Sequence, residues 1–123
     1  MTNARHFIPE GWHSVTPRLF VDDAKALVEF LKNVFDATGE YVDDRPSIVR
    51  IGDSIVMIGD AGVRNSITAF LYAYVADTDA TYQRAVTAGA HIIEEPRDTP
   101  YGDRRCMIED PGGNTWQIAT YRG

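Results

Sequence analysis

The stretch from Pro100 to Tyr121, PYGDRRCMIEDPGGNTWQIATY, decides the fold of this chain. It predicts two strands, Arg104 to Glu109 and Asn114 to Tyr121, joined by the turn Asp110-Pro111-Gly112-Gly113. Proline presets one dihedral of such a turn, and glycine accepts the left-handed conformations that other residues avoid. A shorter hairpin of the same kind surrounds Ile51-Gly52-Asp53-Ser54. The chain is therefore expected to be a doubled unit.

The same order of elements is predicted on both sides of a short polar seam, Ala61 to Ser66. Each half begins with an alternating strand, continues with an amphipathic helix that follows a capping aspartate, and ends with three strands. The elements are expected at Ser14 to Val21, Asp23 to about Asp36 (helix), Glu40 to Asp43, Ser47 to Arg50, Ile55 to Ile58, Thr68 to Val75, Asp77 to Gly89 (helix), His91 to Glu95 and the opening hairpin.

Sliding the chain along itself supports the doubling. An offset of 54 residues places Val21-Asp22-Asp23 on Val75-Ala76-Asp77, and an offset of 60 places Ser54 to Gly59 on Asn114 to Ala119. The predicted fold is α+β in a single domain, with an N-terminal arm at residues 1–13 and βαβββ modules at 14–62 and 67–122. Two such modules are expected to form a curved mixed sheet around a central cavity, with the helices on the outer face.

Composition excludes several classes of function. The 123 residues include 12 basic and 18 acidic ones, a balance that argues against nucleic acid as a partner. No apolar run is long enough for a membrane span, and the N-terminus lacks the apolar core of a secretion signal, so a cytoplasmic location is expected. Cys106, the one cysteine, lies in an apolar strand face and is expected to be a core side chain. No catalytic residue is predicted.

Several motifs resemble those of the vicinal oxygen chelate superfamily, the group of glyoxalase I, bleomycin-resistance proteins and extradiol dioxygenases, and among these its PhnB-like, glyoxalase-related branch. The resemblance depends on Val15 to Asp23, Tyr74 to Asp77, Pro100 to Arg104 and Asp110 to Trp116. It implies paired βαβββ modules, and it implies a homodimer, because many members form one. It also implies a concave face on which the enzymes of the superfamily hold a divalent metal with four His, Gln or Glu side chains.

At the four positions that the resemblance assigns to metal ligands, this chain has Thr16, Met57, Phe70 and Gln117. Only Gln117 offers a suitable donor, and one weak ligand does not hold a metal. No metal and no other cofactor is therefore predicted.

Aromatic residues with a few polar groups are expected on the concave face, and this lining suits a flat or anionic small molecule. The predicted ligand-binding residues are Arg18, Phe20, Met57, Phe70, Tyr72, Tyr74, Arg105 and Gln117. The first hypothesis is a metal-free protein that binds or sequesters such a ligand, for example an antibiotic or a toxic metabolite. The alternatives are a lyase, isomerase or dioxygenase with a displaced metal site, and a structural subunit whose aromatic residues fill the cavity.

Overall fold

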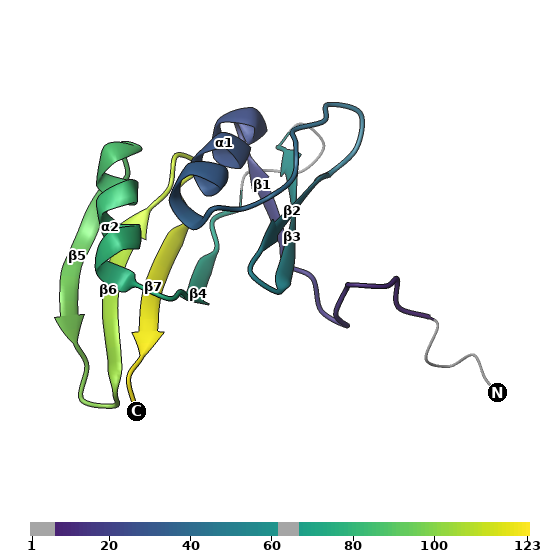
Figure 1. Cartoon of the computed structure of the whole chain (residues 1–123). Helices are drawn as coiled ribbons and strands as arrows, with labels where there is room; N and C mark the ends of the chain where they lie inside the picture. The colour runs from purple at the N-terminus through teal and green to yellow at the C-terminus, as the bar shows by residue number, and fades with distance from the viewer. Residues whose placement is uncertain (1–6, 62–66) are drawn as a thin grey trace.

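The computed structural model describes residues 7–61 and 67–123, and these form two similar modules (Figure 1). The first six residues of the predicted arm and residues 62–66 of the predicted seam lie outside the described part. The elements are β1 (Arg18–Val21), α1 (Ala24–Phe35), β2 (Ser47–Ile51), β3 (Ser54–Asp60), β4 (Phe70–Tyr74), α2 (Thr78–Thr87), β5 (His91–Asp98), β6 (Asp103–Glu109) and β7 (Thr115–Tyr121).

The strands form two mixed sheets, with the orders β1-β3-β2 and β4-β7-β6-β5. In each sheet the first strand of the module pairs in parallel with the last strand, and the remaining pairs are antiparallel. The predicted α+β class is confirmed, and the described strands belong to two separate sheets, one from each module.

The internal repeat is visible in the strand register and in the helix starts. Arg18 of β1 lies opposite Met57 of β3, and the offsets of 54 and 60 residues carry this pair onto Tyr72 and Gln117, which are also opposite each other. The backbone N–H of Ala24 donates to the Asp60 carboxylate at 3.1 Å. At the same offsets, the N–H of Thr78 donates to the Thr120 hydroxyl at 3.0 Å. The end of the last strand therefore anchors the start of the helix in both modules.

Both helices begin as the sequence predicts. The carboxylates of Asp23 and Asp77 each accept a hydrogen bond, at 3.0 Å, from the backbone N–H three residues later. Helix α1 ends at Asp36, which adopts the left-handed conformation with φ of 56°, and Gly89 follows α2 with φ of 85°. Capping aspartates satisfy N–H groups that otherwise have no partner in the first turn.

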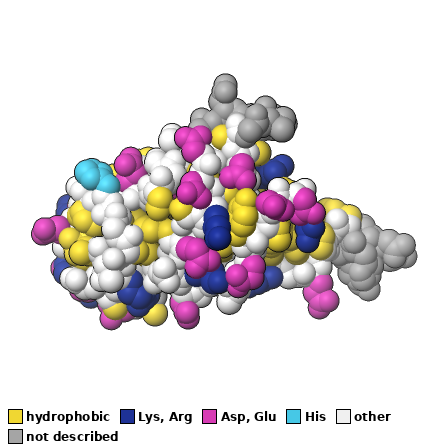
Figure 2. Space-filling view, turned by 90° about the horizontal axis from the view of Figure 1, so that it is seen from above, with side chains coloured by type: hydrophobic (Ala, Val, Ile, Leu, Met, Phe, Trp, Pro, Cys, Tyr) yellow, Lys and Arg dark blue, Asp and Glu magenta, His cyan; other side chains and the backbone are white. Residues whose placement is uncertain are grey.

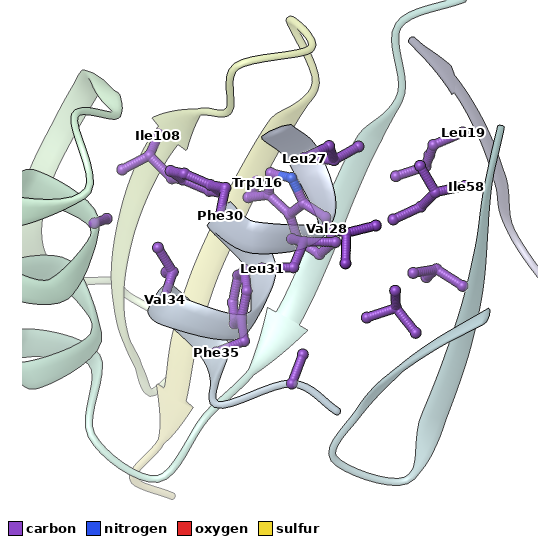
Figure 3. Packing of buried hydrophobic residues seen from close by; sticks show 14 of the residues in the cluster. Leu19, Leu27, Val28, Phe30, Leu31, Val34, Phe35, Ile58, Ile108 and Trp116 are labelled. Carbon is purple, nitrogen blue, oxygen red and sulfur yellow. The ribbon is translucent and has the colours of Figure 1, made fainter. Parts of the chain in front are cut away.

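Helix α1 joins the two modules through the core. Its buried stripe packs toward both sheets, with Leu19 and Ile58 on one side and Trp116 on the other (Figure 3). The rings of Phe35 and Trp116 lie 4.9 Å apart, centroid to centroid. The faces of the sheets opposite the helices remain open, and they expose Ile48, Phe70, Tyr72 and Tyr74.

The first strand is shorter than predicted. The alternation Ser14 to Val21 suggested a strand with Val15 on the apolar side, but β1 begins at Arg18 and Val15 is 82% exposed. Pro17 precedes the strand and has no N–H to donate to a ladder. Its carbonyl still accepts from the N–H of Met57 at 3.0 Å, and pairing continues only from Arg18 onward.

The predicted edge strand Glu40 to Asp43 is wrong. Between α1 and β2, the chain pairs with β2 at Thr38, through a single bridge to Arg50. Gly39 then turns the chain with φ of 127°, and the Ser47 hydroxyl accepts from the N–H of Val42 at 2.9 Å. A side chain therefore satisfies a backbone group that a strand ladder would have used.

Strand β5 is longer than the predicted strand His91 to Glu95, and it continues through Pro96 to Asp98. The register against β6 shifts twice between Ile92 and Arg97. Since β5 is an edge strand, the missing N–H of Pro96 removes no hydrogen bond from the interior of the sheet.

The lengths of the helices and the surface charges are relevant to membranes and nucleic acid as partners. No helix in the described part of the chain is long and apolar enough to cross a membrane. On the face shown in Figure 2, basic side chains lie singly among acidic ones, in keeping with the formal net charge of -6.

Candidate ligand-binding site

A hollow of about 320 Å³ lies between the two modules. We call it the inter-module hollow. One wall comes from the first module, and it consists of Pro17, Val56 and the β2–β3 turn Ile51 to Ser54. The other wall is the β4 segment Leu71 to Tyr74 together with Trp116 of β7. The cavity predicted between the modules therefore has a counterpart in the structure, large enough for a small organic molecule.

Trp116 is held in this wall by the β6–β7 turn. Its indole N–H donates to the buried carboxylate of Asp110 at 2.8 Å. The same carboxylate accepts from the backbone N–H of Gly112 at 2.8 Å and from that of Asn114 at 3.0 Å. The turn motif Asp-Pro-Gly-Gly-Asn-Thr-Trp is thus a hydrogen-bonded unit that fixes the orientation of the indole.

Asn114 connects this turn to β4. Its side-chain N–H₂ donates to Asp110, and its side-chain oxygen accepts from the backbone N–H of Ala69 at 2.9 Å. Asn114 is fully buried, so these bonds are shielded from water. They set the start of β4, and they thereby place Tyr72 and Tyr74 relative to Trp116.

Tyr72 and Tyr74 form an aromatic pair on the open face of β4. Their ring centroids are 5.4 Å apart and the ring planes are tilted by 56°. Both hydroxyls donate to one oxygen of Asp103, at 2.5 Å from Tyr72 and 3.2 Å from Tyr74. Asp103 is only 3% exposed, whereas Tyr72 and Tyr74 are 39% and 63% exposed. The carboxylate therefore lies behind two phenols that face solvent.

The tyrosine hydroxyls keep their protons at neutral pH. Burial is the main cause that raises the pKa of Tyr72 well above the usual value for a phenol, and the hydrogen bond to Asp103 raises it further. The pKa of Tyr74 is raised by the same two causes. Each phenol proton is directed at Asp103, and a hydrogen bond between the Tyr72 and Tyr101 hydroxyls also contributes to the raised pKa of Tyr72.

Arg105 is already paired on the same face. Its guanidinium donates twice to one oxygen of Glu94, at 3.1 and 3.2 Å, and once to the hydroxyl of Tyr101 at 2.6 Å. The Arg105 side chain is 13% exposed. Its charge is therefore compensated, and an anionic ligand would have to displace Glu94.

Arg18 and Phe20 line a different hollow, of about 420 Å³. The guanidinium carbon of Arg18 lies 4.9 Å from the centroid of the Phe20 ring. The remaining lining of this second hollow includes three carboxylates, Asp43, Asp44 and Asp60, and one further cation, Arg45. An anion would meet net negative charge there.

The structure therefore separates the predicted site residues into groups. Tyr72 and Tyr74 line the inter-module hollow, and Arg18 and Phe20 line the second one. Four more residues lie in strands and line neither of these two hollows: Met57 in β3, Phe70 in β4, Arg105 in β6 and Gln117 in β7. Within one chain the eight residues do not form a single site.

Several residues were not predicted from the sequence as site residues, among them Trp116, which lines the hollow, and Asp103, which holds the two tyrosine hydroxyls. Asp53 and Ser54 belong to the β2–β3 turn, and only the tertiary fold brings them opposite β4. Asp103 was expected to be an ordinary turn or edge residue. Its burial and its two phenol donors come from the tertiary fold, so the sequence carried no signal for its role.

The described residues do not fit the metal site that the resemblance implies. Met57, Phe70 and Gln117 offer a thioether, a ring and one amide, and Thr16 precedes β1. Divalent zinc, nickel, manganese and iron prefer imidazole or carboxylate donors. In residues 7–61 and 67–123, no group of three or more His, Cys, Asp and Glu side chains is arranged to hold a metal ion.

Cys106 lies in β6 and is fully buried. Burial is the main cause that raises the pKa of its thiol to about 12. The thiolate, which is the nucleophilic form, is therefore disfavoured. The predicted core role of this side chain agrees with its position.

Comparison with known proteins identifies the family. A family model described as Glyoxalase/Bleomycin resistance protein/Dioxygenase superfamily matches residues 11–118. Uncharacterized protein Rv0887c of Mycobacterium tuberculosis is 29% identical over 126 residues, which cover 85% of this chain and 72% of that protein. Anthracycline biosynthesis protein DnrV of Streptomyces peucetius is 40% identical over 76 residues, 58% of this chain but only 27% of DnrV.

Solved structures share the fold. TioX from Micromonospora sp. ML1 has a TM-score of 0.76 at 22% identity, and the match covers 89% of this chain and 98% of TioX. A glyoxalase/bleomycin resistance protein/dioxygenase family enzyme from Burkholderia phytofirmans PsJN has a TM-score of 0.73 at 20% identity. The match covers 85% of this chain and 94% of that enzyme. With the family model matching most of its length, this chain belongs to the glyoxalase/bleomycin resistance protein/dioxygenase superfamily.

Proposed function

We propose that this protein binds a flat aromatic small molecule in the inter-module hollow, without a metal ion. The observation that carries the proposal is the lining: Tyr72, Tyr74 and Trp116 line one cavity, and the polar residues Asp53 and Ser54 line it too. Aromatic rings stack on planar compounds, and a few polar groups orient them. The hydrogen bond to Asp110 already fixes the orientation of the Trp116 indole, so ligand binding loses no side-chain entropy at this residue.

The name of one relative supports the same class of ligand. DnrV, which is 40% identical over the matched segment, is named for anthracycline biosynthesis. An anthracycline is a flat, fused-ring compound, and the aromatic lining of the hollow suits such a shape. An anionic ligand has less support, because Glu94 compensates Arg105 and because three carboxylates outnumber the two arginines, Arg18 and Arg45, in the second hollow.

The proposal is tested by titrating the protein with acridone, an uncharged tricyclic compound, in an isothermal calorimeter. We expect binding, and we expect Tyr74→Ser to weaken it about tenfold because a stacking ring is lost. Tyr74 is well exposed, so this variant is expected to fold.

The matched control is Tyr121→Ser. Tyr121 is 67% exposed and does not line the hollow, so its loss should leave the affinity unchanged. Equal effects of the two substitutions, or no binding by the wild-type protein, would contradict the proposed function.

A further inference from the structure

The C-terminal end of α1 is connected to both walls of the inter-module hollow. Phe35, the last residue of the helix, places its ring centroid 4.9 Å from that of Trp116, which lines the second-module wall (Figure 3). Three residues later, Thr38 pairs with Arg50 through two backbone hydrogen bonds of 3.0 and 2.9 Å. Arg50 directly precedes Ile51, which begins the turn in the first-module wall. A shift of this end of α1 would therefore displace both walls.

A side chain of the second module holds this end of α1. The Nε–H of Arg84, in α2, donates to the backbone carbonyl oxygen of Val34 at 3.0 Å. Carbonyls in the last turn of a helix have no N–H partner within the helix, and a cation is favourable there because it meets the negative end of the helix dipole. The N–H of Thr38, four residues after Val34, donates to the Arg50 carbonyl instead. Arg84 therefore supplies a donor that the helix itself does not.

The guanidinium of Arg84 is itself held in orientation. Its Nη2 group donates to the hydroxyl oxygen of Thr81, one turn earlier in α2, at 3.2 Å. Thr81 is 2% exposed, and its hydroxyl donates to the Asp77 carbonyl at 2.9 Å. In the part of the chain that the structure describes, no carboxylate forms an ion pair with Arg84. The side chain thus joins the two modules and does not neutralise an acidic group.

We propose that Arg84 is a positioning residue for the inter-module hollow: it fixes the C-terminal end of α1 and thereby the distance between the two walls. The proposal rests on the proposed function and deepens it, because walls at a fixed distance make the hollow selective for rigid flat rings. Arg84 does not line the hollow, so it acts on a ligand only through α1. A preorganised site favours a rigid ligand that fits it over a flexible one, which loses more conformational entropy on binding.

The test compares acridone with diphenylamine, which has the same two benzene rings on one nitrogen but lacks the bridging carbonyl, so its rings rotate. Calorimetric titration measures both affinities, and we expect the wild-type protein to prefer acridone. Arg84→Met removes the hydrogen bond to Val34 and keeps an unbranched side chain. We expect this variant to bind acridone about fivefold more weakly, the equivalent of one ordinary hydrogen bond. Its affinity for diphenylamine should change little, because rotating rings can follow displaced walls.

A rescue variant and a matched control accompany this comparison. Arg84→Lys keeps a cation that can donate to the Val34 carbonyl, so it should retain most of the preference for acridone. Arg45→Met removes the same charge from a side chain that is 68% exposed and does not line the inter-module hollow. It should leave both affinities unchanged. Arg84 is one of the exposed residues of α2, so its variants are expected to fold, and thermal unfolding checks this.

The indole N–H signal of Trp116 in a nuclear magnetic resonance spectrum reports on the wall without any ligand. We expect Arg84→Met to shift this signal and to leave the Trp12 signal in place. Equal losses of affinity for the two compounds, or the same loss of preference in Arg45→Met, would overturn the inference and leave the proposed function standing. If the wild-type protein bound neither compound, the proposed function would fail. The ligand-free spectrum would still decide on Arg84, because an unchanged Trp116 signal would show that Arg84 does not position the wall.

Discussion

Asp110 shows how much of the site depends on a single side chain. Its carboxylate accepts from two backbone N–H groups of the β6–β7 turn, from the Asn114 amide and from the Trp116 indole. The residue is 4% exposed, so water cannot replace these bonds if the carboxylate is removed. The same side chain therefore stabilises the turn and places a ring in the wall of the inter-module hollow.

We predict that Asp110→Ala lowers the free energy of unfolding by about 3 kcal/mol or more, because several buried donors lose their acceptor. Urea denaturation followed by circular dichroism measures the loss. The control is Asp98→Ala, which removes an exposed carboxylate with only surface ion pairs and should cost less than about 1 kcal/mol. Similar losses in the two variants would show that Asp110 has no special structural role.

At the scale of elements, the β6–β7 turn packs against the first module. A Cβ atom added to Gly112 would lie 2.5 Å from Cγ1 of Val21, the last residue of β1. Such a distance is shorter than any van der Waals contact, so the side chain of Val21 or the turn would have to move. The turn of the second module is thus a close contact between modules as well as a connection between strands.

We expect Gly112→Ala to destabilise the protein by about 1–3 kcal/mol, the usual cost of overpacking a buried contact. The comparison is Gly52→Ala in the shorter hairpin, where a Cβ atom would meet no atom within 4 Å. Gly52 has φ of 59°, so that substitution costs only backbone strain, about 1 kcal/mol. A smaller thermal shift for Gly112→Ala than for Gly52→Ala would refute the packing argument.

The sequence predicted most elements because their signals are local. Asp23 and Asp77 cap the helices as expected, and the two offsets reproduce the strand register of both modules. The edge strand at residues 40–43 was wrong because Ser47 supplies a side-chain partner that no periodicity reveals. The site was predicted only in part. Tyr72 and Tyr74 follow from strand alternation, whereas Asp53 reaches the hollow through tertiary packing.

For the whole molecule, the exposed apolar surface suggests that one chain does not act alone. Phe70, Tyr101 and Tyr121 are all at least 59% exposed in the single chain. Large exposed apolar patches of this kind mark interfaces more often than free surface. The predicted homodimer, with a second copy of this chain over the open sheet faces, remains our proposal for what covers them.

Light scattering coupled to size-exclusion chromatography tests the dimer. We expect a mass of about twice the 13.7 kDa of one chain, since two copies would bury these rings together. Phe70→Glu should shift the protein toward the monomer, because a charge would be buried in the interface. Val86→Glu, at an exposed position of α2 on the helical side, is the control and should leave the mass unchanged. A wild-type protein of monomer mass would exclude this dimer.

The central claim, that a flat ligand binds between the modules without a metal, is tested most directly by nuclear magnetic resonance. The chain has two tryptophans, Trp116 in the wall of the hollow and Trp12 before β1, so two indole N–H signals report on different places. The protein is titrated with acridone in the presence of the chelator EDTA. We predict that the Trp116 indole signal shifts with saturation while the Trp12 signal stays in place. Binding that disappears with EDTA, or a shift confined to Trp12, would contradict the account.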